Sequence, residues 1–273
     1  MKELFIRLYG GAIYVGLVVG SIFLGDFALA ILLGIFSYLG TSELGRLTGN
    51  AARPRQSEML GVGIMFLFAG LALIWFRISL ADPRLLFLAA FITFMAFIFI
   101  SGKNNRNTAL FHLYLSITYL ALPLFLLLAL MNPWRGPESD GQIVLGLFVM
   151  IWVFDSFAYL SGKLLGRHKL APSISPKKTW EGFAGGLIFT MGAAWLWASW
   201  YSGLTTPQWI AVGLIAGIAG TAGDLFESML KRRAGVKDSG NLIPGHGGIL
   251  DRIDSILFAA PVTFLFIILF FRN

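Results

Sequence analysis

The sequence contains no cysteine and has few charged residues. Without cysteine, the 273 residues cannot form disulfides, thiolate metal sites or cysteine nucleophiles. Charged residues make up only 13% of the chain, against roughly 25% in an average soluble domain, and histidine occurs only three times. Any metal or phosphate chemistry must therefore depend on a small set of carboxylates, lysines and arginines.

Apolar residues fill most of the chain, at 57% of the sequence. Crossing a bilayer takes about 20 apolar residues in a helix, and many uncharged runs approach or exceed that length. The run 182–223 would extend about 63 Å as one helix, so we expect it to turn near 203–207. We predict an all-α, polytopic integral membrane protein with about nine transmembrane helices. Their predicted ranges are 4–24, 27–47, 58–76, 84–101, 108–131, 142–163, 181–201, 208–232 and 250–271.

The basic residues predict the orientation of these helices. With nine crossings, 17 of the 21 lysines and arginines fall on the side of the N-terminus. Because positive charge concentrates on the cytoplasmic side of membrane proteins, we predict a cytoplasmic N-terminus and an external C-terminus. The pI near 9.8 then reflects membrane topology, and we expect no nucleic-acid partner.

Four aspartates are candidate metal ligands. Asp155 and Asp224 fall inside predicted spans, at about 12 and 10 Å from the cytoplasmic end, where a carboxylate is costly and usually functional. Asp251 and Asp254 lie three residues apart at the start of the last helix, hence on one face. Oxygen ligands without thiolates favour Mg²⁺. Alternatively, the first two pair with lysines on their own helices and the last two stabilise a helix N-terminus.

One helix carries a polar stripe that leads from these aspartates to the membrane surface. Asp224, Glu227, Ser228 and Lys231 are spaced at i, i+3, i+4 and i+7, so they share one helix face. We expect this stripe to line a water-filled cleft. The alternative is that it seals one helix against another.

Two basic loops, at about 164–180 and 233–249, have the composition of phosphate-binding segments. The first contains Ser175-Pro176-Lys177-Lys178-Thr179 directly before a predicted helix, whose free N–H groups favour phosphate. Lysines in such a loop can instead be topology signals or anchors for anionic headgroups. The second loop contains His246 between glycines, which allow a ligand to approach the backbone closely.

The segment from Ser228 to Asp254 resembles the phosphatidate cytidylyltransferase (CDP-diacylglycerol synthase) family. Shorter similarities occur at 155–159 and 175–182, so the recognisable region covers about 155–254. The matching positions of the main segment are Ser228, Lys231, Arg232, Lys237, Asp238, Gly240, Pro244, His246, Gly247, Gly248, Asp251, Arg252 and Asp254.

This resemblance implies transfer of CMP from CTP to phosphatidic acid, yielding CDP-diacylglycerol and pyrophosphate. It implies a requirement for Mg²⁺ and suggests a second cation, such as K⁺. We assign catalysis to Asp224, Lys231, Asp251 and Asp254, and metal binding to Asp155, Asp224, Asp251 and Asp254. Phosphate binding is assigned to Ser175, Lys177, Lys178, Thr179, Ser228, Lys231, Arg232, Lys237, Asp238, His246 and Arg252.

We expect two regions, a transmembrane scaffold at 1–135 that favours dimerisation and a catalytic region at 136–273. The expected location is the inner (plasma) membrane, with a cytoplasmic active site.

Two other functions share some of these features. A transporter or channel would also place carboxylates in the membrane, normally near its midplane. A CTP-dependent lipid kinase of the dolichol or phytol type would share a nucleotide site but release CDP.

Overall fold

The structure is a computed structural model that describes residues 2–48, 54–77, 108–131, 141–201, 203–242 and 247–270. Almost all of this part is helical, which confirms the predicted all-α fold. The helices are α1 (Lys2–Leu24), α2 (Asp26–Leu47), α3 (Pro54–Arg77), α5 (Thr108–Leu115), η2 (Ser116–Ala121), α6 (Leu122–Ala129), α7 (Gln142–Leu165), α8 (Trp180–Trp200), α9 (Thr206–Arg233) and α10 (Leu250–Phe270).

Eight of the nine predicted helices are present in this part of the chain, with α5, η2 and α6 forming the continuous segment predicted over 108–131. The helix predicted over 84–101 lies outside the described residues. Six helical segments in the described part are long and apolar enough to span a membrane. The protein is thus an integral, multi-pass membrane protein.

The predicted turn between α8 and α9 has a specific sequence cause. Thr205 caps α9, and its backbone N–H donates a 2.6 Å hydrogen bond to Gln208 Oε1 in a capping box. Pro207 occupies the first turn of α9, where its missing N–H has no partner to lose. The long uncharged run therefore folds back as two antiparallel spans.

Two local features depart from simple transmembrane helices. In the basic loop after α7, strands β1 (Lys169–Ala171) and β2 (Ser175–Thr179) form an antiparallel hairpin, with Lys169 opposite Thr179. In the span 108–129, η2 is a π-helical segment. It presents Tyr119 to Phe226 of α9 and Phe258 of α10, with ring centroids 5.0 and 6.2 Å apart.

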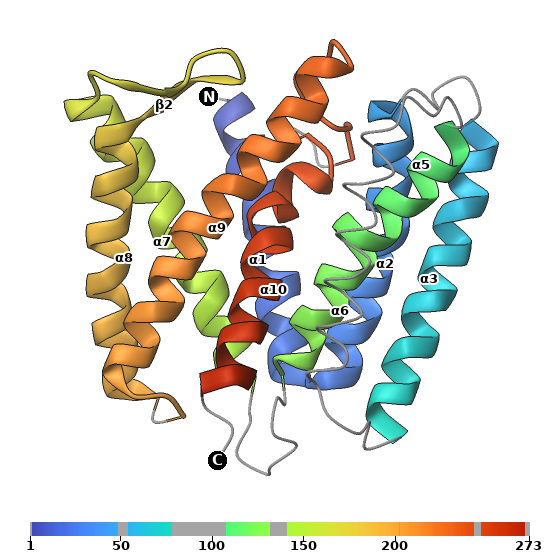
Figure 1. Cartoon of the computed structure of the whole chain (residues 1–273), viewed down its shortest axis with the longest axis horizontal. Coiled ribbons are helices and arrows are strands. Elements are labelled where there is room, and N and C mark those ends of the chain that lie inside the picture. The colour runs from blue at the N-terminus through green and yellow to red at the C-terminus, as the bar shows by residue number, and fades with distance from the viewer. Residues whose placement is uncertain are drawn as a thin grey trace.

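The described helices share one hydrophobic core. Its buried residues come from both predicted regions, from Leu33 of α2 to Leu126 of α6, Trp209 of α9 and Phe264 of α10. Figure 1 shows the helices side by side, with the hairpin, the start of α1 and the end of α9 at one end of the bundle. The C-terminal end of α10 lies at the other end.

Glycines let the helices around this end approach closely. A Cβ on Gly182 of α8 would lie 2.6 Å from the carbonyl oxygen of Ala158 on α7. A Cβ on Gly223 of α9 would collide with the carbonyl oxygen of Asp254 on α10. Small residues at such crossings are typical of membrane helices, and here they bring α8 close to α7 and α9 close to α10 beside the basic loops.

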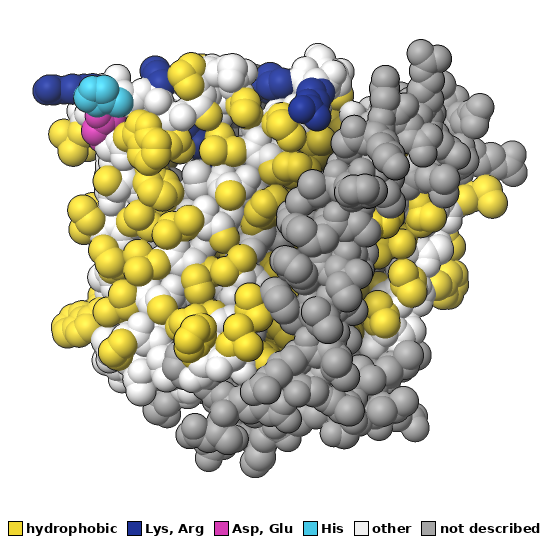
Figure 2. Space-filling model, viewed as in Figure 1, with side chains coloured by type: hydrophobic (Ala, Val, Ile, Leu, Met, Phe, Trp, Pro, Cys, Tyr) yellow, Lys and Arg dark blue, Asp and Glu magenta, His cyan; other side chains and the backbone are white. Residues whose placement is uncertain are grey.

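The surface agrees with a membrane setting. Large apolar side chains such as Phe23, Ile188 and Trp200 are 63–75% exposed on the outer faces of the helices. Figure 2 shows hydrophobic side chains over the flank of the bundle and lysines and arginines gathered along the end that carries the hairpin. This separation is the one expected between the hydrocarbon layer and a basic membrane surface.

Candidate functional site

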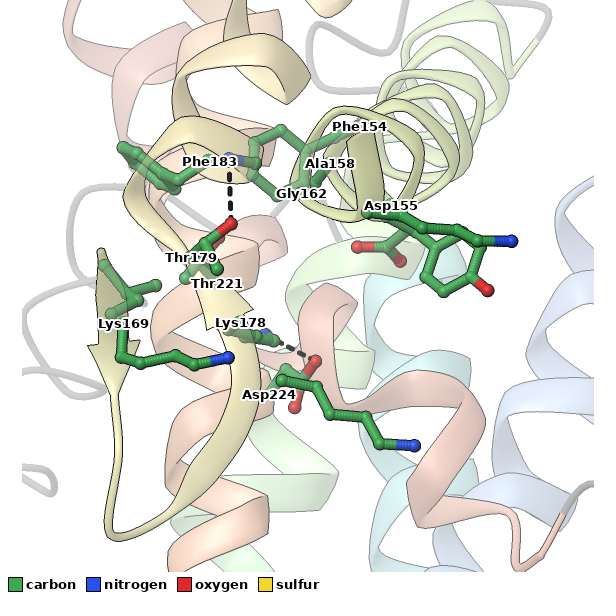
Figure 3. A pocket seen from close by; sticks show the side chains of 15 residues that line it. Phe154, Asp155, Ala158, Gly162, Lys169, Lys178, Thr179, Phe183, Thr221 and Asp224 are labelled. Atoms are coloured by element: carbon green, nitrogen blue, oxygen red, sulfur yellow. Dashed lines mark hydrogen bonds and ion pairs between the residues drawn. The ribbon is translucent and has the colours of Figure 1, made fainter. Parts of the chain in front are cut away.

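A groove of about 430 Å³ opens between α7, α8, α9 and the hairpin (Figure 3). Its lining residues are Phe154, Asp155, Ala158, Tyr159, Gly162, Lys163, Lys169, Leu170, Lys177, Lys178, Thr179, Gly182, Phe183, Thr221 and Asp224. The structure thus gathers five of the predicted site residues, which come from segments about 70 positions apart. Four lysines and two aspartates give the groove charges of both signs within an apolar frame.

Lys178 of β2 and Asp224 of α9 form an ion pair in this groove, with 2.6 Å between Nζ and Oδ2 (Figure 3). Their side chains are 27% and 29% exposed. Ser228, one turn further along α9, donates a 3.2 Å hydrogen bond to Asp224 Oδ1. A predicted phosphate ligand and a predicted metal ligand therefore neutralise each other.

The hairpin that carries Lys178 is attached to the start of α8. Thr179 is buried, and its Oγ1 accepts a 3.1 Å hydrogen bond from the backbone N–H of Gly182, capping the helix. Glu181 accepts hydrogen bonds from the backbone N–H groups of Arg167 and His168, and lies 2.6 Å from His168 Nδ1. Thr179 thus supports the hairpin, while Lys177 and Lys178 extend into the groove.

A second charged cluster, more buried than the first, lies between α9 and α10. Lys231 Nζ lies 2.6 Å from Glu227 Oε2 and 2.6 Å from Asp251 Oδ1. The side chains of Lys231, Glu227 and Asp251 are only 11%, 0% and 8% exposed. One buried cation therefore holds together carboxylates from two helices.

Asp251 also organises the loop that precedes α10. Its Oδ2 accepts hydrogen bonds from the N–H and hydroxyl of Ser239, both at 2.9 Å, and from the N–H of Gly248 at 2.8 Å. Gly247 has a positive φ of 81°, and a Cβ there would collide with this same oxygen. Both oxygens of Asp251 are thus engaged, one by Lys231 and one by the loop.

Asp254 lies one turn beyond Asp251, half-buried between the helices. The backbone N–H of Ser255 donates a 2.6 Å hydrogen bond to its Oδ1. Asp254 experiences the like charges of Asp224, Glu227 and Asp155. Asp254 therefore lies near the carboxylates of α7 and α9, although Lys178 and Lys231 pair with two of them.

The sequence predicts that the polar stripe on α9 lines one cleft, but the structure divides the stripe between two surroundings. Asp224 lines the groove, whereas Glu227 and Lys231 are buried against α10. The stripe divides because α10 covers the end of α9 nearest the loop, and the ion pair between Lys231 and Asp251 seals this contact. Lys231 is consequently buried rather than open to the groove.

The remaining predicted phosphate ligands occupy different surroundings. Arg232 donates hydrogen bonds to the carbonyl oxygens of Ile174 and Val236, at 3.3 and 3.2 Å. Ser175 is half-buried at the start of β2, and Lys237 and Asp238 are exposed after α9. The backbone oxygen of Arg252, on α10, accepts a 3.0 Å hydrogen bond from Tyr14. His246 and Pro244 lie outside the described residues.

Glu43, on α2, is a site residue that sequence reasoning missed. It is 5% exposed, accepts hydrogen bonds from the backbone N–H groups of Ile249 and Leu250, and lies 2.9 Å from Ser239 Oγ. The predicted N-terminal scaffold contained no such residue. In the sequence, Glu43 is a single carboxylate near the end of an apolar helix. Carboxylates at the membrane surface occupy the same kind of position, so the sequence alone does not mark Glu43 as a site residue.

The donor chemistry of this end of the bundle fits a hard cation. Asp155, Asp224 and Asp254 supply only oxygen atoms, and their mutual repulsion would be offset by a divalent ion. Among the described residues, no three carboxylate or histidine side chains already form a metal cage. Lys178 and the loop donors instead occupy oxygens of Asp224 and Asp251.

Comparison with known proteins identifies the family of this chain. Residues 5–270 match the cytidylyltransferase family. The chain belongs to this family. A phosphatidate cytidylyltransferase from Synechocystis is 49% identical over 148 residues, which are 50% of this chain and 47% of that protein.

Two further relatives show the same extent of similarity. A phosphatidate cytidylyltransferase from Staphylococcus aureus is 46% identical over 134 residues, 48% of this chain and 51% of the relative. An uncharacterised Escherichia coli protein, YnbB, is 46% identical over 138 residues, 50% of this chain and 46% of its own. The matched region thus spans about half the length of the curated relatives.

Proposed function

We propose that this protein is a phosphatidate cytidylyltransferase, which transfers CMP from CTP to phosphatidic acid and releases pyrophosphate. The observation that carries the proposal is the groove in which lysines of a basic hairpin face aspartates of α7 and α9. Membership of the cytidylyltransferase family and the similarity to relatives with this name support the choice of substrates.

The reaction requires two polyanions to meet. An oxygen of the phosphatidate phosphate attacks the α-phosphorus of CTP, and the bond from this phosphorus to the oxygen bridging to the β-phosphate breaks. The leaving pyrophosphate keeps the electron pair, and CMP remains on the lipid. Because the lipid phosphate is already a nucleophile, the protein contributes mainly positioning and charge neutralisation.

The lysines of the groove are suited to bind these phosphates. Lys177 and Lys178 approach from β2, and Lys163 and Lys169 from the end of α7 and from β1. When a phosphate arrives, Lys178 can exchange Asp224 for it at low cost because the pair is partly exposed. Asp224 would then be free to accept another cation.

Mg²⁺ would be held by Asp224 and Asp254, with Asp155 beside them, and would neutralise charge on the transferred and leaving phosphates. A second cation, such as K⁺, is also expected. Asp251, our fourth predicted ligand, would have to release Lys231 or the loop to bind a metal directly. In the arrangement described, it positions Lys231 and the start of α10.

The apolar frame of the groove suits a lipid substrate. Phe154, Tyr159 and Phe183 line it beside the charged residues, and Tyr159 is 70% exposed on the outside of α7. A phosphatidate headgroup could thus enter among the lysines while its acyl chains remain in the bilayer. We propose that this end faces the cytoplasm in the inner membrane, and that the protein functions as a homodimer.

Radiolabelled CTP distinguishes the proposed function from its rivals. Purified protein in detergent would receive phosphatidate, Mg²⁺ and CTP labelled at the α-phosphate, and we expect the label in the lipid phase. A lipid kinase would instead transfer the γ-phosphate to a lipid alcohol, so the α-label would stay in CDP in the aqueous phase. Solute accumulation in proteoliposomes without CTP, together with no lipid labelling, would indicate a transporter.

Substitution of Asp254 tests the proposed metal site. Asp254→Asn should reduce transfer at least about 100-fold, because charge stabilisation at a reacting phosphate has this magnitude. Its melting temperature should equal or exceed that of the wild type, because the change removes repulsion from neighbouring carboxylates. Asp26→Asn, at the start of α2, is the control and should transfer normally. Near-normal transfer by folded Asp254→Asn would exclude this residue from metal binding.

A further inference from the structure

Glu43 connects the N-terminal helices to the loop before α10. We infer that it is a positioning residue of the active site, which fixes this loop and thereby Asp251, Lys231 and Asp254. The inference rests on the proposed function for its catalytic consequence, but its structural part is independent. Glu43 lies in the last two turns of α2, about 200 positions before the groups it contacts.

The carboxylate of Glu43 caps α10 from outside that helix. Its Oε1 lies 2.9 Å from the N–H of Ile249, and its Oε2 lies 3.0 Å from the N–H of Leu250. The first N–H groups of a helix have no partner within the helix, and a negative charge there is favourable to the helix dipole. Glu43 thus satisfies two donors that the loop itself leaves unpaired.

Ser239 places the same carboxylate next to Asp251. Its hydroxyl oxygen lies 2.9 Å from Glu43 Oε2 and 2.9 Å from Asp251 Oδ2, while its N–H donates to Asp251. A hydroxyl has one proton to donate, so it can bond to only one of the two carboxylates at a time. Backbone N–H groups of the loop therefore hold both buried anions in place, and Lys231 adds a cation to Asp251 alone.

The loop is folded so closely around Glu43 that two of its glycines have no room for a side chain. A Cβ on Gly240 would lie 2.6 Å from Glu43 Oε1, with other atoms of the same side chain as its next neighbours. A Cβ on Gly248 would collide with Glu43 Oε2 and Ser239 Oγ. Both glycines belong to the segment that resembles the family, so Glu43 explains part of that pattern.

Removing the carboxylate should loosen the start of α10 and displace the groups it carries. Asp251 follows Leu250 directly, and Asp254 is one turn further along. Ile249 and Leu250 would lose their hydrogen-bond acceptor, and Ser239 would retain only Asp251. A shift in this turn would separate Asp254 from Asp224 and alter the contact between Lys231 and Asp251.

The test compares Glu43→Gln with Leu33→Ala. Leu33 is a buried residue of the same helix, about 15 Å along its axis, and its truncation removes packing without touching the loop. Hydrogen exchange of a peptide containing Ile249 and Leu250, melting temperature, kcat and KM would be measured for both. Glu43→Gln should raise exchange of this peptide about tenfold or more, because a buried donor loses its acceptor.

The catalytic readout separates positioning from general stability. We expect Glu43→Gln to reduce kcat at least about tenfold with little change in KM for CTP. The groups that Glu43 positions act mainly in the transition state, so displacing them slows the reaction more than it weakens CTP binding. Leu33→Ala should lower the melting temperature while leaving loop exchange and kcat near normal. Unchanged exchange in Glu43→Gln, or an equal loss of kcat in Leu33→Ala, would overturn the inference.

A suppressor experiment provides a second test. Gly240→Ala should destabilise the protein because its methyl group meets Glu43, and Glu43→Asp should restore stability in the double variant by withdrawing the carboxylate about 1.5 Å. If Gly240→Ala is equally destabilising with aspartate at position 43, the proposed contact is wrong. If the wild type transfers no CMP, the proposed function fails, while hydrogen exchange and suppression still decide the structural role.

Discussion

Two lysine–aspartate pairs at this end of the bundle have the same length but different surroundings. Lys178 and Asp224 lie 2.6 Å apart with side chains 27% and 29% exposed. Lys231 and Asp251 also lie 2.6 Å apart, but are 11% and 8% exposed, and Lys231 has a second partner in Glu227. Distance alone does not distinguish these pairs, so burial must decide what each can do.

Burial makes the first pair exchangeable and the second fixed. Exposed pairs contribute about 0–1 kcal/mol, so Lys178 can leave Asp224 for a phosphate at little cost. Removing one partner from a buried pair costs about 3–5 kcal/mol, because a charge remains without compensation. We therefore expect Lys178 to bind substrate and Lys231 to hold α9, α10 and the loop in register.

The strongest test is Lys231→Met, which keeps the length of the side chain and removes its charge. Glu227 and Asp251 would then face each other without a cation, so we expect a loss of stability of about 3–5 kcal/mol. Thermal unfolding in detergent measures this loss, and CMP transfer should disappear with the displaced loop. A Lys231→Met variant that unfolds at the wild-type temperature would refute the comparison.

A second substitution sharpens this result. Adding Glu227→Gln to Lys231→Met removes one of the two uncompensated charges and should recover part of the lost stability. Transfer should remain low, because Asp251 would still lack its cation. Recovery of full activity would mean that Lys231 serves only to offset Glu227.

Lys178→Gln should have the opposite pattern, with little effect on stability and a large effect on substrate binding. We expect a change in stability below about 1 kcal/mol. We expect KM to rise about tenfold for the substrate whose phosphate Lys178 holds, because the variant loses one charged hydrogen bond to that phosphate. Measuring KM separately for CTP and phosphatidate identifies that substrate. Lys177→Gln is the matched variant on the same strand, and an equal stability loss in Lys178→Gln and Lys231→Met would contradict the comparison.

The sequence predicted the helices well because their main signal is local. Uncharged runs of sufficient length identified the eight predicted helices that the described residues contain, and the limits of the α8–α9 turn were set by residues such as Thr205 and Pro207. The positions of Asp155 and Asp224 along their helices were also predictable, since they follow from the rise of a helix. These features require no knowledge of how the helices pack.

Features that depend on packing could not be predicted. Burial of Lys231 follows from the position of α10 over α9, although the spacing on α9 alone suited an open cleft equally well. Glu43 acts on backbone N–H groups, which are present in every sequence and leave no pattern. The β1–β2 hairpin is short and exposed, and the π-helical turn around Tyr119 has no distinctive composition.

The smallest effect we predict concerns Arg232, which directly follows Lys231 on the chain but belongs to neither pair. Its guanidinium donates to the carbonyl oxygens of Ile174 and Val236, so it connects the hairpin turn to the end of α9. Arg232→Lys keeps the positive charge, but a lysine cannot donate to both carbonyl oxygens in the geometry of the guanidinium group. If Arg232 positions the hairpin, KM should rise about threefold to tenfold, the equivalent of one lost hydrogen bond, with an unchanged melting temperature. If only its charge matters, Arg232→Lys should match the wild type while Arg232→Gln loses activity, and the hairpin then keeps Lys178 in place without this contact.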